Sequence, residues 1–180
     1  MAISVPAFVP PPAAADPRRR ILILSLVGLA LFLAWQALAL RSFIAVETRP
    51  PAWDQAVHLD RALDYRQALG RGRWSELPSF PPLYYIVLTR AYDSPDPAGA
   101  ALWLNWFYLA LLSASLFGLA FHFRPDWSAL PCTLLFLCAP GLQELFYTQL
   151  VDLSLIALTA AAYWALVRSE DFRSWTWSLG

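Results

Sequence analysis

The chain carries little charge and lacks several motifs that would reveal an enzyme class. Only 14% of its 180 residues are charged, the formal net charge is zero, and lysine is absent. Because there is no excess of positive charge to attract a polyanion, we expect no nucleic-acid partner. The sequence also contains no glycine-rich phosphate loop, no Gly-x-Ser-x-Gly motif and no zinc-ligand spacing, so none of these motifs supports an assignment.

Cysteine is almost as scarce as lysine. Cys132 and Cys138 are the only two, and they lie six residues apart in an apolar run. On a helix this separation places the two side chains on different faces, so a disulfide between them is not expected.

Apolar residues fill most of the chain. They make up 58% of the residues, and the mean hydropathy is +0.47, well above the usual share in a soluble domain. Nine Trp, seven Tyr and eleven Phe suit a protein with many membrane–water boundaries, where amphipathic rings settle. The composition therefore predicts an all-α polytopic membrane protein.

The first membrane span is predicted over residues 21–40. Twenty apolar residues at 1.5 Å rise reach about 30 Å, the thickness of the hydrocarbon core. Residues 1–20 are proline-rich and are expected to be a disordered cytoplasmic tail. Arg18, Arg19 and Arg20 end this tail and mark the cytoplasmic side. A cleaved signal peptide is the alternative, since Ala37-Leu38-Ala39 resembles a cleavage site, but the length of the run favours an uncleaved anchor.

Two helices that do not cross the membrane are predicted after this span, over residues 52–69 and 83–92. The first is framed by Pro50-Pro51 and Gly70. One face of it collects Ala52, Ala56, Leu59 and Leu63, and the opposite face collects Asp54, His58, Arg61 and Tyr65. Such a helix lies along an interface. The apolar part of the second helix is too short to cross.

Three further spans are predicted over residues 99–123, 128–146 and 151–167, which makes about four in all. With a cytoplasmic N-terminus, the short inner segments carry Arg18–Arg20, Arg124, Arg168 and Arg173. The short outer loops carry Asp93, Asp96 and Asp152. This distribution satisfies the positive-inside rule. It places both interfacial helices outside, and it indicates an integral protein of a bacterial inner (plasma) membrane.

Asp54 and Asp152 are the main candidates for chemistry, because the same topology puts both on the outer side. Asp54 begins its helix, where the dipole favours a carboxylate, and it suits a base for a hydroxyl or a cation ligand. An ordinary acid at a helix start is the alternative. Asp152 lies between two spans with few other charges and is costly there without a task. A helix N-cap is its alternative role, and Glu144 is a rival acid two turns earlier.

Other polar residues give weaker signals. His58 lies one turn after Asp54, but a single histidine without Cys or His partners does not make a metal site, so no metal ligand is assigned. Five arginines in the outer loop suit a phosphate or a lipid headgroup, or form a solvated face: Arg49, Arg61, Arg66, Arg71 and Arg73.

Taken together, these segments resemble the N-terminal part of a GT-C glycosyltransferase. The resemblance is to the bacterial relatives of protein O-mannosyltransferases and aminoarabinose transferases, and it covers about residues 20–180. Four segments carry it in order: an N-terminal span, PPAWDQAVHLDRAL, FPPLYYIVL and FYTQLVDLSLIALTAAAYWAL. In that family an acid opens the first outer helix, a Pro-Pro-Leu-Tyr-like segment follows, and a second Asp precedes the fourth span.

The resemblance implies transfer of a sugar from a polyprenyl-phosphate donor to a lipid, glycan or protein acceptor on the outer face of the membrane, with inversion. Asp54 would be the catalytic base, and Asp152 would position the acceptor or the donor. His58, Arg61, Tyr84 and Glu144 are the candidate substrate-binding residues. No cofactor is assigned, and a divalent metal ion is left open.

This chain departs from the family pattern at two positions. Gln55 stands where a Glu often follows the first Asp, and Phe80 stands where relatives often carry His or Lys. The family has more spans than this chain, so we expect a fragment that is inactive alone. The alternatives are a small polytopic protein without chemistry, such as a scaffold, and a transporter subunit with Asp152 on an ion path.

Overall fold

The computed structural model describes residues 16–51, 53–73, 75, 77, 82–148, 150–170, 173–174 and 176, and the elements that it defines there are helices. In chain order these are α1 (Pro17–Val46), α2 (Trp53–Gly70), α3 (Pro82–Leu88), the 3₁₀ helix η2 (Thr89–Asp93), α4 (Pro97–Phe123), α5 (Ala129–Leu137), α6 (Pro140–Tyr147) and α7 (Val151–Arg168). Most of the predicted tail, residues 1–15, lies outside the described residues, as do Ala52, Phe80 and Pro81.

Three helices, α1, α4 and α7, are long and apolar enough to cross a membrane. The pair α5 and α6 adds a fourth span if it counts as one, because the two helices pass the same test together. The chain is therefore an all-helical, membrane-embedded protein with three to four candidate spans, and the fold class predicted from the sequence is confirmed at this level.

The span predicted over 128–146 corresponds to two helices, α5 and α6, which are bent by 59° at a break that the sequence prediction did not include. Pro140 causes the break: it has no backbone N–H, and its ring clashes with the preceding turn of a helix. The residue before a proline avoids the helical region, and Ala139 accordingly has φ −58° and ψ 132°. Pro140 then becomes the first residue of α6, a position where its fixed φ suits a helix.

The first helix is longer than the apolar run on which the prediction rested. Asp16 caps α1, because its Oδ1 accepts a hydrogen bond from the backbone N–H of Arg18 at 3.0 Å, and Pro17 opens the helix. Arg18, Arg19 and Arg20 thus belong to the first turn of α1 rather than to a tail. At its other end α1 continues to Val46.

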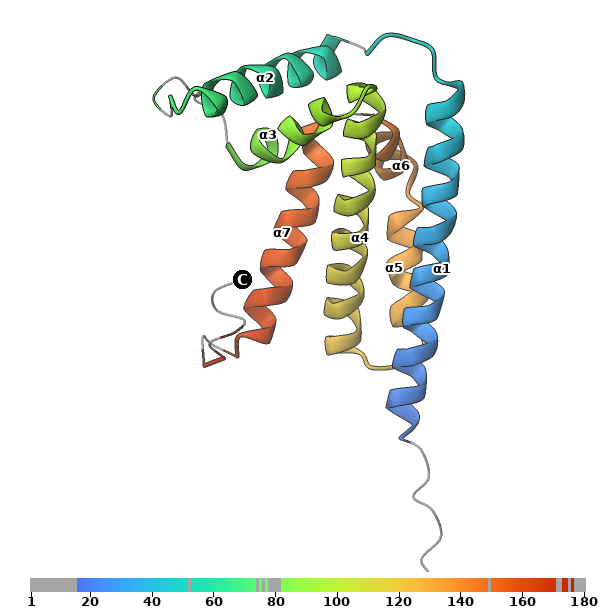
Figure 1. Cartoon of the computed structure of the whole chain (residues 1–180). Helices are drawn as coiled ribbons and strands as arrows, with labels where there is room; N and C mark the ends of the chain where they lie inside the picture. The colour runs from blue at the N-terminus through green and yellow to red at the C-terminus, as the bar shows by residue number, and fades with distance from the viewer. Residues whose placement is uncertain are drawn as a thin grey trace, which may run out of the picture.

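The helices form a bundle with a layer across one end. In Figure 1, α1, α4, α5 and α7 run alongside one another, and α2 and α3 lie across the end where α1 finishes and where α4 and α7 begin. We call this the α2–α3 end. The opposite end holds the first turn of α1, the turn between α4 and α5, and the last turn of α7. We call it the α4–α5 turn end.

The helices predicted over 52–69 and 83–92 correspond to this layer. The first is α2. The second is only partly α-helical, because α3 stops at Leu88 and the chain tightens into η2. The tighter 3₁₀ form commonly serves as a connector, and here it leads toward Asp96, which caps α4 by accepting from the N–H of Gly99 at 3.0 Å.

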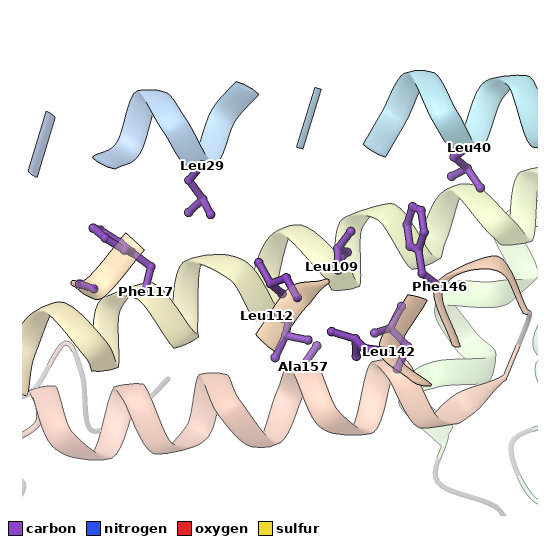
Figure 2. Packing of buried hydrophobic residues seen from close by; sticks show 11 residues of the cluster. Leu29, Leu40, Leu109, Leu112, Phe117, Leu142, Phe146 and Ala157 are labelled. Atoms are coloured by element: carbon purple, nitrogen blue, oxygen red, sulfur yellow. The ribbon is translucent and has the colours of Figure 1, made fainter. Parts of the chain in front are cut away.

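The bundle core is apolar and lies between α1, α4 and α7, with α5 and α6 closing it. Figure 2 shows Leu29 and Leu40 of α1 facing α4, with Leu112 of α4 close to Ala157 of α7. Gly118 lets α7 approach α4, because a Cβ at this position would collide with the ring of Trp164.

Asn105 of α4 binds the chain where α6 ends. Its side chain is 1% exposed and donates to the carbonyl oxygens of Leu145, Phe146 and Thr148 at 3.4, 3.1 and 2.7 Å. These carbonyls lie at or beyond a helix C-terminus, where intrahelical donors run out. Lipid provides no substitute donor, so the side chain of α4 has to supply one.

Gln143 makes a second polar contact at the break between α5 and α6. Its amide donates to the carbonyl of Leu137, the last residue of α5, at 2.7 Å. Its Oε1 accepts from the side-chain amide of Gln36 on α1 at 3.0 Å. The break that Pro140 imposes is therefore bridged by side chains from α6 and α1.

Candidate functional site

The candidate site begins with α2, which presents an aromatic face to the rest of the protein. Tyr65 and Ala62 are fully buried, whereas Ala56, on the face predicted to be apolar, is exposed. Grouping Tyr65 with the polar side was therefore wrong. The physical reason is that a tyrosine ring buries a large apolar surface and needs water or a partner only at its hydroxyl.

Tyrosines of α3 complete this aromatic layer. The rings of Tyr65 and Tyr85 stack with centroids 5.3 Å apart, and Tyr84 meets Tyr85 edge-on at 5.3 Å. Tyr84 and Tyr85 are 5% and 2% exposed. Farther along, the hydroxyl of Tyr92 in η2 donates to the carbonyl of Leu59 at 2.7 Å. Burial raises the pKa of Tyr65 and Tyr92, so both hydroxyls stay protonated.

His58 is held inside this layer. Its Nδ1 lies 2.8 Å from the hydroxyl of Tyr85, and its ring meets that of Tyr84 edge-on with centroids 6.0 Å apart. Burial lowers the pKa of His58 and the nearby positive charge of Arg61 lowers it further, while Asp54 and Asp152 act in the opposite direction. The net effect is a lower pKa, so the ring of His58 stays uncharged to a lower pH than a free histidine does.

The start of α7 lies at the same end of the bundle as α2. Asp54 and Asp152 are far apart in sequence, yet both carboxylates raise the pKa of His58. Val151, the first residue of α7, packs against the buried tyrosines. The fold therefore gathers Asp54, His58 and Asp152 at the α2–α3 end.

Asp152 is not the N-cap of α7. The cap position belongs to Leu150, which makes no side-chain cap bond, and Asp152 lies in the first helical turn. Both Asp152 and Asp54 are exposed. Neither carboxylate forms a hydrogen bond or an ion pair within the part of the chain that the structure describes. Their oxygen atoms are therefore accessible to a ligand.

A cavity of about 410 Å³ opens beside this cluster at the same end. Its lining comes from the end of α1, the segment before α2, the first turns of α2 and α4, and the end of α6: Phe43, Glu47, Arg49, Pro50, Pro51, Gln55, Ala98, Leu102, Glu144, Tyr147 and Thr148. Glu144 is thus the one predicted site residue in the lining. Asp54 and Asp152 do not line the cavity, although Gln55 beside Asp54 does.

The arginine in the cavity lining already forms an ion pair. Arg49 makes two side-chain hydrogen bonds to Glu47, at 2.9 and 2.6 Å. These bonds lower the pKa of Glu47 to about 2, so the pair stays ionised. The positive charge of Arg49 is largely balanced by this partner, and Glu144 leaves the lining with an excess of negative charge.

Two residues that make contacts in the candidate site were not identified from the sequence. Tyr85 holds His58, and its only signal was the Tyr84-Tyr85 pair after the prolines. Glu47 pairs with Arg49 two residues later, in a stretch that the prediction treated as a solvated loop. Hydrophobic periodicity could not reveal either contact, because both depend on which face of a helix or loop turns inward.

Metal-binding groups do not gather in the described residues: no three His, Cys, Asp or Glu side chains there are arranged to hold an ion. Cys132 and Cys138 are both free. No protein-family model matches the chain, and neither a curated protein nor a solved structure matches it.

Proposed function

We propose that the chain is the N-terminal membrane part of a glycosyltransferase that uses a polyprenyl-phosphate sugar as donor. The observation that carries the proposal is that two accessible carboxylates, Asp54 and Asp152, lie at the end of the bundle that holds a cavity, and that both raise the pKa of His58. A membrane sugar transferase needs such a site at a membrane boundary, where a lipid-linked donor and a polar acceptor can both reach it.

The distribution of charge supports an outward-facing site. The short segments at the α4–α5 turn end carry Arg18, Arg19, Arg20, Arg124 and Arg168, whereas the arginines at the α2–α3 end are interspersed with acids in a long segment. Positive residues mark the cytoplasmic side of a membrane protein. The α2–α3 end then faces outward, which is the side where polyprenyl-linked sugars are used in the family that the sequence resembles. The membrane is a bacterial inner membrane, with the N-terminus in the cytoplasm.

The proposed reaction is a single displacement. An acceptor hydroxyl attacks the anomeric carbon of the sugar, the bond from that carbon to the phosphate oxygen breaks, and polyprenyl phosphate leaves. Asp54 accepts the proton of the hydroxyl, for which it is suited by its exposure and by having no hydrogen-bond or ion-pair partner among the described residues. Asp152 positions one of the two substrates, and His58 and Arg61 line the same region.

Replacing Asp54 tests this proposal. Asp54→Asn is introduced into the gene at its own chromosomal position, and transfer of radiolabelled sugar from polyprenyl phosphate is measured in isolated membranes. Loss of a general base lowers the rate by about a hundredfold or more. Asp64→Asn, an exposed acid on the same helix, is the matched control and retains full transfer. Equal rates in the Asp54→Asn and control membranes would remove Asp54 from catalysis.

Kinetic measurements on Asp152→Asn distinguish the proposed transferase from a membrane protein that has no catalytic activity. We expect this variant to raise the KM for donor or acceptor more than it lowers kcat, because a positioning carboxylate acts mainly through binding. A scaffold or a transporter subunit gives no transfer in wild-type membranes either. Asp152 lies in the first turn of α7, whereas an ion path through the membrane would place its acid near mid-span.

A further inference from the structure

A second cavity lies at the other half of the bundle, far from the tyrosine layer. Its volume is about 400 Å³. Residues of α1, α4 and α7 line it. The apolar lining consists of Leu22, Leu26 and Leu29 of α1, Ala114, Phe117, Gly118 and Phe121 of α4, and Trp164 of α7. We call it the α1–α4–α7 groove.

The groove is polar only at one end. His122 and Arg168 complete the lining, and both belong to the last turns of their helices. On α1 the same end corresponds to Leu22, because α1 runs antiparallel to α4 and α7. The lining of α1 from Leu22 to Leu29 extends about 10 Å at 1.5 Å per residue. The groove is therefore about two turns deep and opens at the α4–α5 turn end.

Arginines of α1 extend the positive charge of this opening. Arg18 and Arg19 lie one helical turn before Leu22, on the neighbouring positions of the same side of the helix. Both are exposed, and neither side chain forms an ion pair with a residue in the described ranges. Exposed guanidinium groups therefore lie one helical turn beyond the apolar lining of α1, although they are not part of the lining itself.

Two of the acids at this end are already engaged. Asp16 caps α1. Asp126 binds Arg124 at 2.7 Å and also accepts hydrogen bonds from Ser128, and the bonds to Ser128 are the main reason why its pKa falls to about 2. Glu170, which follows α7 and is exposed, is a further acid near the opening. A hydrogen bond from a backbone N–H does not neutralise a carboxylate, so Asp16 and Glu170 offset part of the positive charge at this end. Arg18, Arg19, Arg20 and Arg168 still outnumber them.

We propose that the α1–α4–α7 groove binds one anionic phospholipid, with an acyl chain along its apolar lining and the phosphate at Arg18, Arg19, His122 and Arg168. An apolar channel that ends in cations matches an acyl chain joined to an anionic headgroup. A partner helix would contact the bundle over its whole length, whereas this groove covers only the two turns beside the boundary. The proposal is independent of the sugar-transferase proposal.

Trp164 provides the probe. The purified chain is reconstituted in phosphatidylcholine vesicles, and phosphatidylglycerol or phosphatidylcholine with brominated acyl chains is titrated in. Bromine quenches tryptophan fluorescence at contact, and the difference between the wild type and Trp164→Phe isolates this residue from the other Trp residues of the chain. We expect brominated phosphatidylglycerol to quench Trp164 at an at least fivefold lower mole fraction, about the factor that one arginine near an anionic surface supplies.

Two sets of variants locate the headgroup and the chain. The double variant Arg18→Gln, Arg19→Gln lies at the surface and lowers the preference for phosphatidylglycerol by about fivefold for each arginine that contacts the phosphate. Ala114→Phe fills the groove and reduces quenching by both lipids. Ala162→Phe on the exposed side of α7 is the matched control and leaves quenching unchanged.

Several results would overturn the proposal. Equal quenching by the two brominated lipids shows that the groove does not select an anionic headgroup. Absence of Trp164 quenching by either lipid shows that protein covers the groove instead. An unchanged preference after the Arg18 and Arg19 replacements shows that these cations do not hold the phosphate, whatever the Ala114→Phe variant does.

Discussion

The bundle and the α2–α3 layer are both packed, but with different side chains. The bundle core consists mainly of Leu, Phe and Ala, and its buried polar groups include Asn105 and Gln36 near the broken span. The core of the layer is built largely from tyrosines that pack by their rings and bond through their hydroxyls. A core in lipid needs hydrogen bonds where its backbone is interrupted, whereas a layer at the boundary can hold polar groups throughout.

This difference predicts that replacements in the two regions have different effects. Replacements in the bundle should change folding and leave the charge of the site intact. Replacements in the layer should change His58 and its surroundings at smaller cost to the fold. The predictions below test that separation, beginning with the largest effect.

Asn105→Ala should destabilise the bundle by about 3 kcal/mol, because the carbonyls of Leu145, Phe146 and Thr148 lose their donor and a cavity remains. The free energy of unfolding in mixed micelles, followed by circular dichroism, measures this. Ser113→Ala is the matched control, since Ser113 is equally buried in α4 but bonds only to Leu109 of its own helix. Similar losses in the two variants would show that the α4–α6 contact is not special.

Gly118→Ala should cost about 2 kcal/mol, because the new Cβ collides with Trp164 and forces α4 and α7 apart. The same unfolding measurement applies. Gly141→Ala in α6 is the control, since nothing lies within 4 Å of its Cβ position and alanine is the better helix former. Equal stability of the two variants would contradict the close α4–α7 contact.

Tyr85→Phe should cost about 1 kcal/mol, the usual value of one hydrogen bond. The ring packing of Tyr85 is retained, so the helical content should not change. The expected signature is local: hydrogen exchange of α2 amides becomes faster, while that of α4 amides does not. Uniformly faster exchange in both helices would show that layer and bundle do not behave as separate units.

Asp152→Asn should lower the pKa of His58 further, because it removes a charge that raises this pKa, and Arg61→Gln should raise it. A histidine whose folded pKa is depressed contributes stability above its unfolded value near 6.5, and this stability is lost as the pH falls from there to the folded pKa. Asp152→Asn therefore deepens the acid-induced loss. Nuclear magnetic resonance titration reads His58 directly, with His122 at the far end as internal reference. No change in either variant would mean that Asp152 is remote from His58.

Asp93→Asn should have the smallest effect, below about 0.5 kcal/mol. Asp93 pairs with Arg66 at 3.1 Å and joins η2 to α2, but the two side chains are 54% and 42% exposed. Exposed ion pairs contribute little because water screens them. We expect the free energy of unfolding to be insensitive to salt in both this variant and the wild type, because tyrosine packing holds the layer together. A loss above 1 kcal/mol would instead make ion pairs its main support.

Much of the fold was predictable, because lipid imposes simple length and hydropathy requirements. The spans that became α1, α4 and α7 were identified from apolar runs, with boundaries that differ by a few residues. The division of the third apolar run into α5 and α6 was not predicted, although Pro140 and Gly141 are residues that commonly interrupt a helix. Hydropathy averages over a window and does not register the loss of one backbone N–H.

The candidate site residues remain a prediction, and their contacts were not predicted. Asp54, His58 and Asp152 were named from spacing and topology, and both carboxylates raise the pKa of His58. The cavity that includes Glu144 and Gln55, the Glu47–Arg49 pair and the contact of Tyr85 with His58 were not predicted. Each of these contacts depends on how a helix or loop is rotated about its axis. The periodicity of one sequence does not specify that rotation.

The sequence by itself determined that this chain is helical and lies in a membrane, with most of its acids on the loops of one side. Those properties follow from the transfer of apolar and charged groups between water and lipid, which is nearly independent of neighbours. Only the tertiary structure decided which face of α2 is buried, how far α5 and α6 bend and which groups surround His58. These depend on close packing between helices, where a single proline, glycine or tyrosine hydroxyl selects one arrangement among several that hydropathy leaves equal.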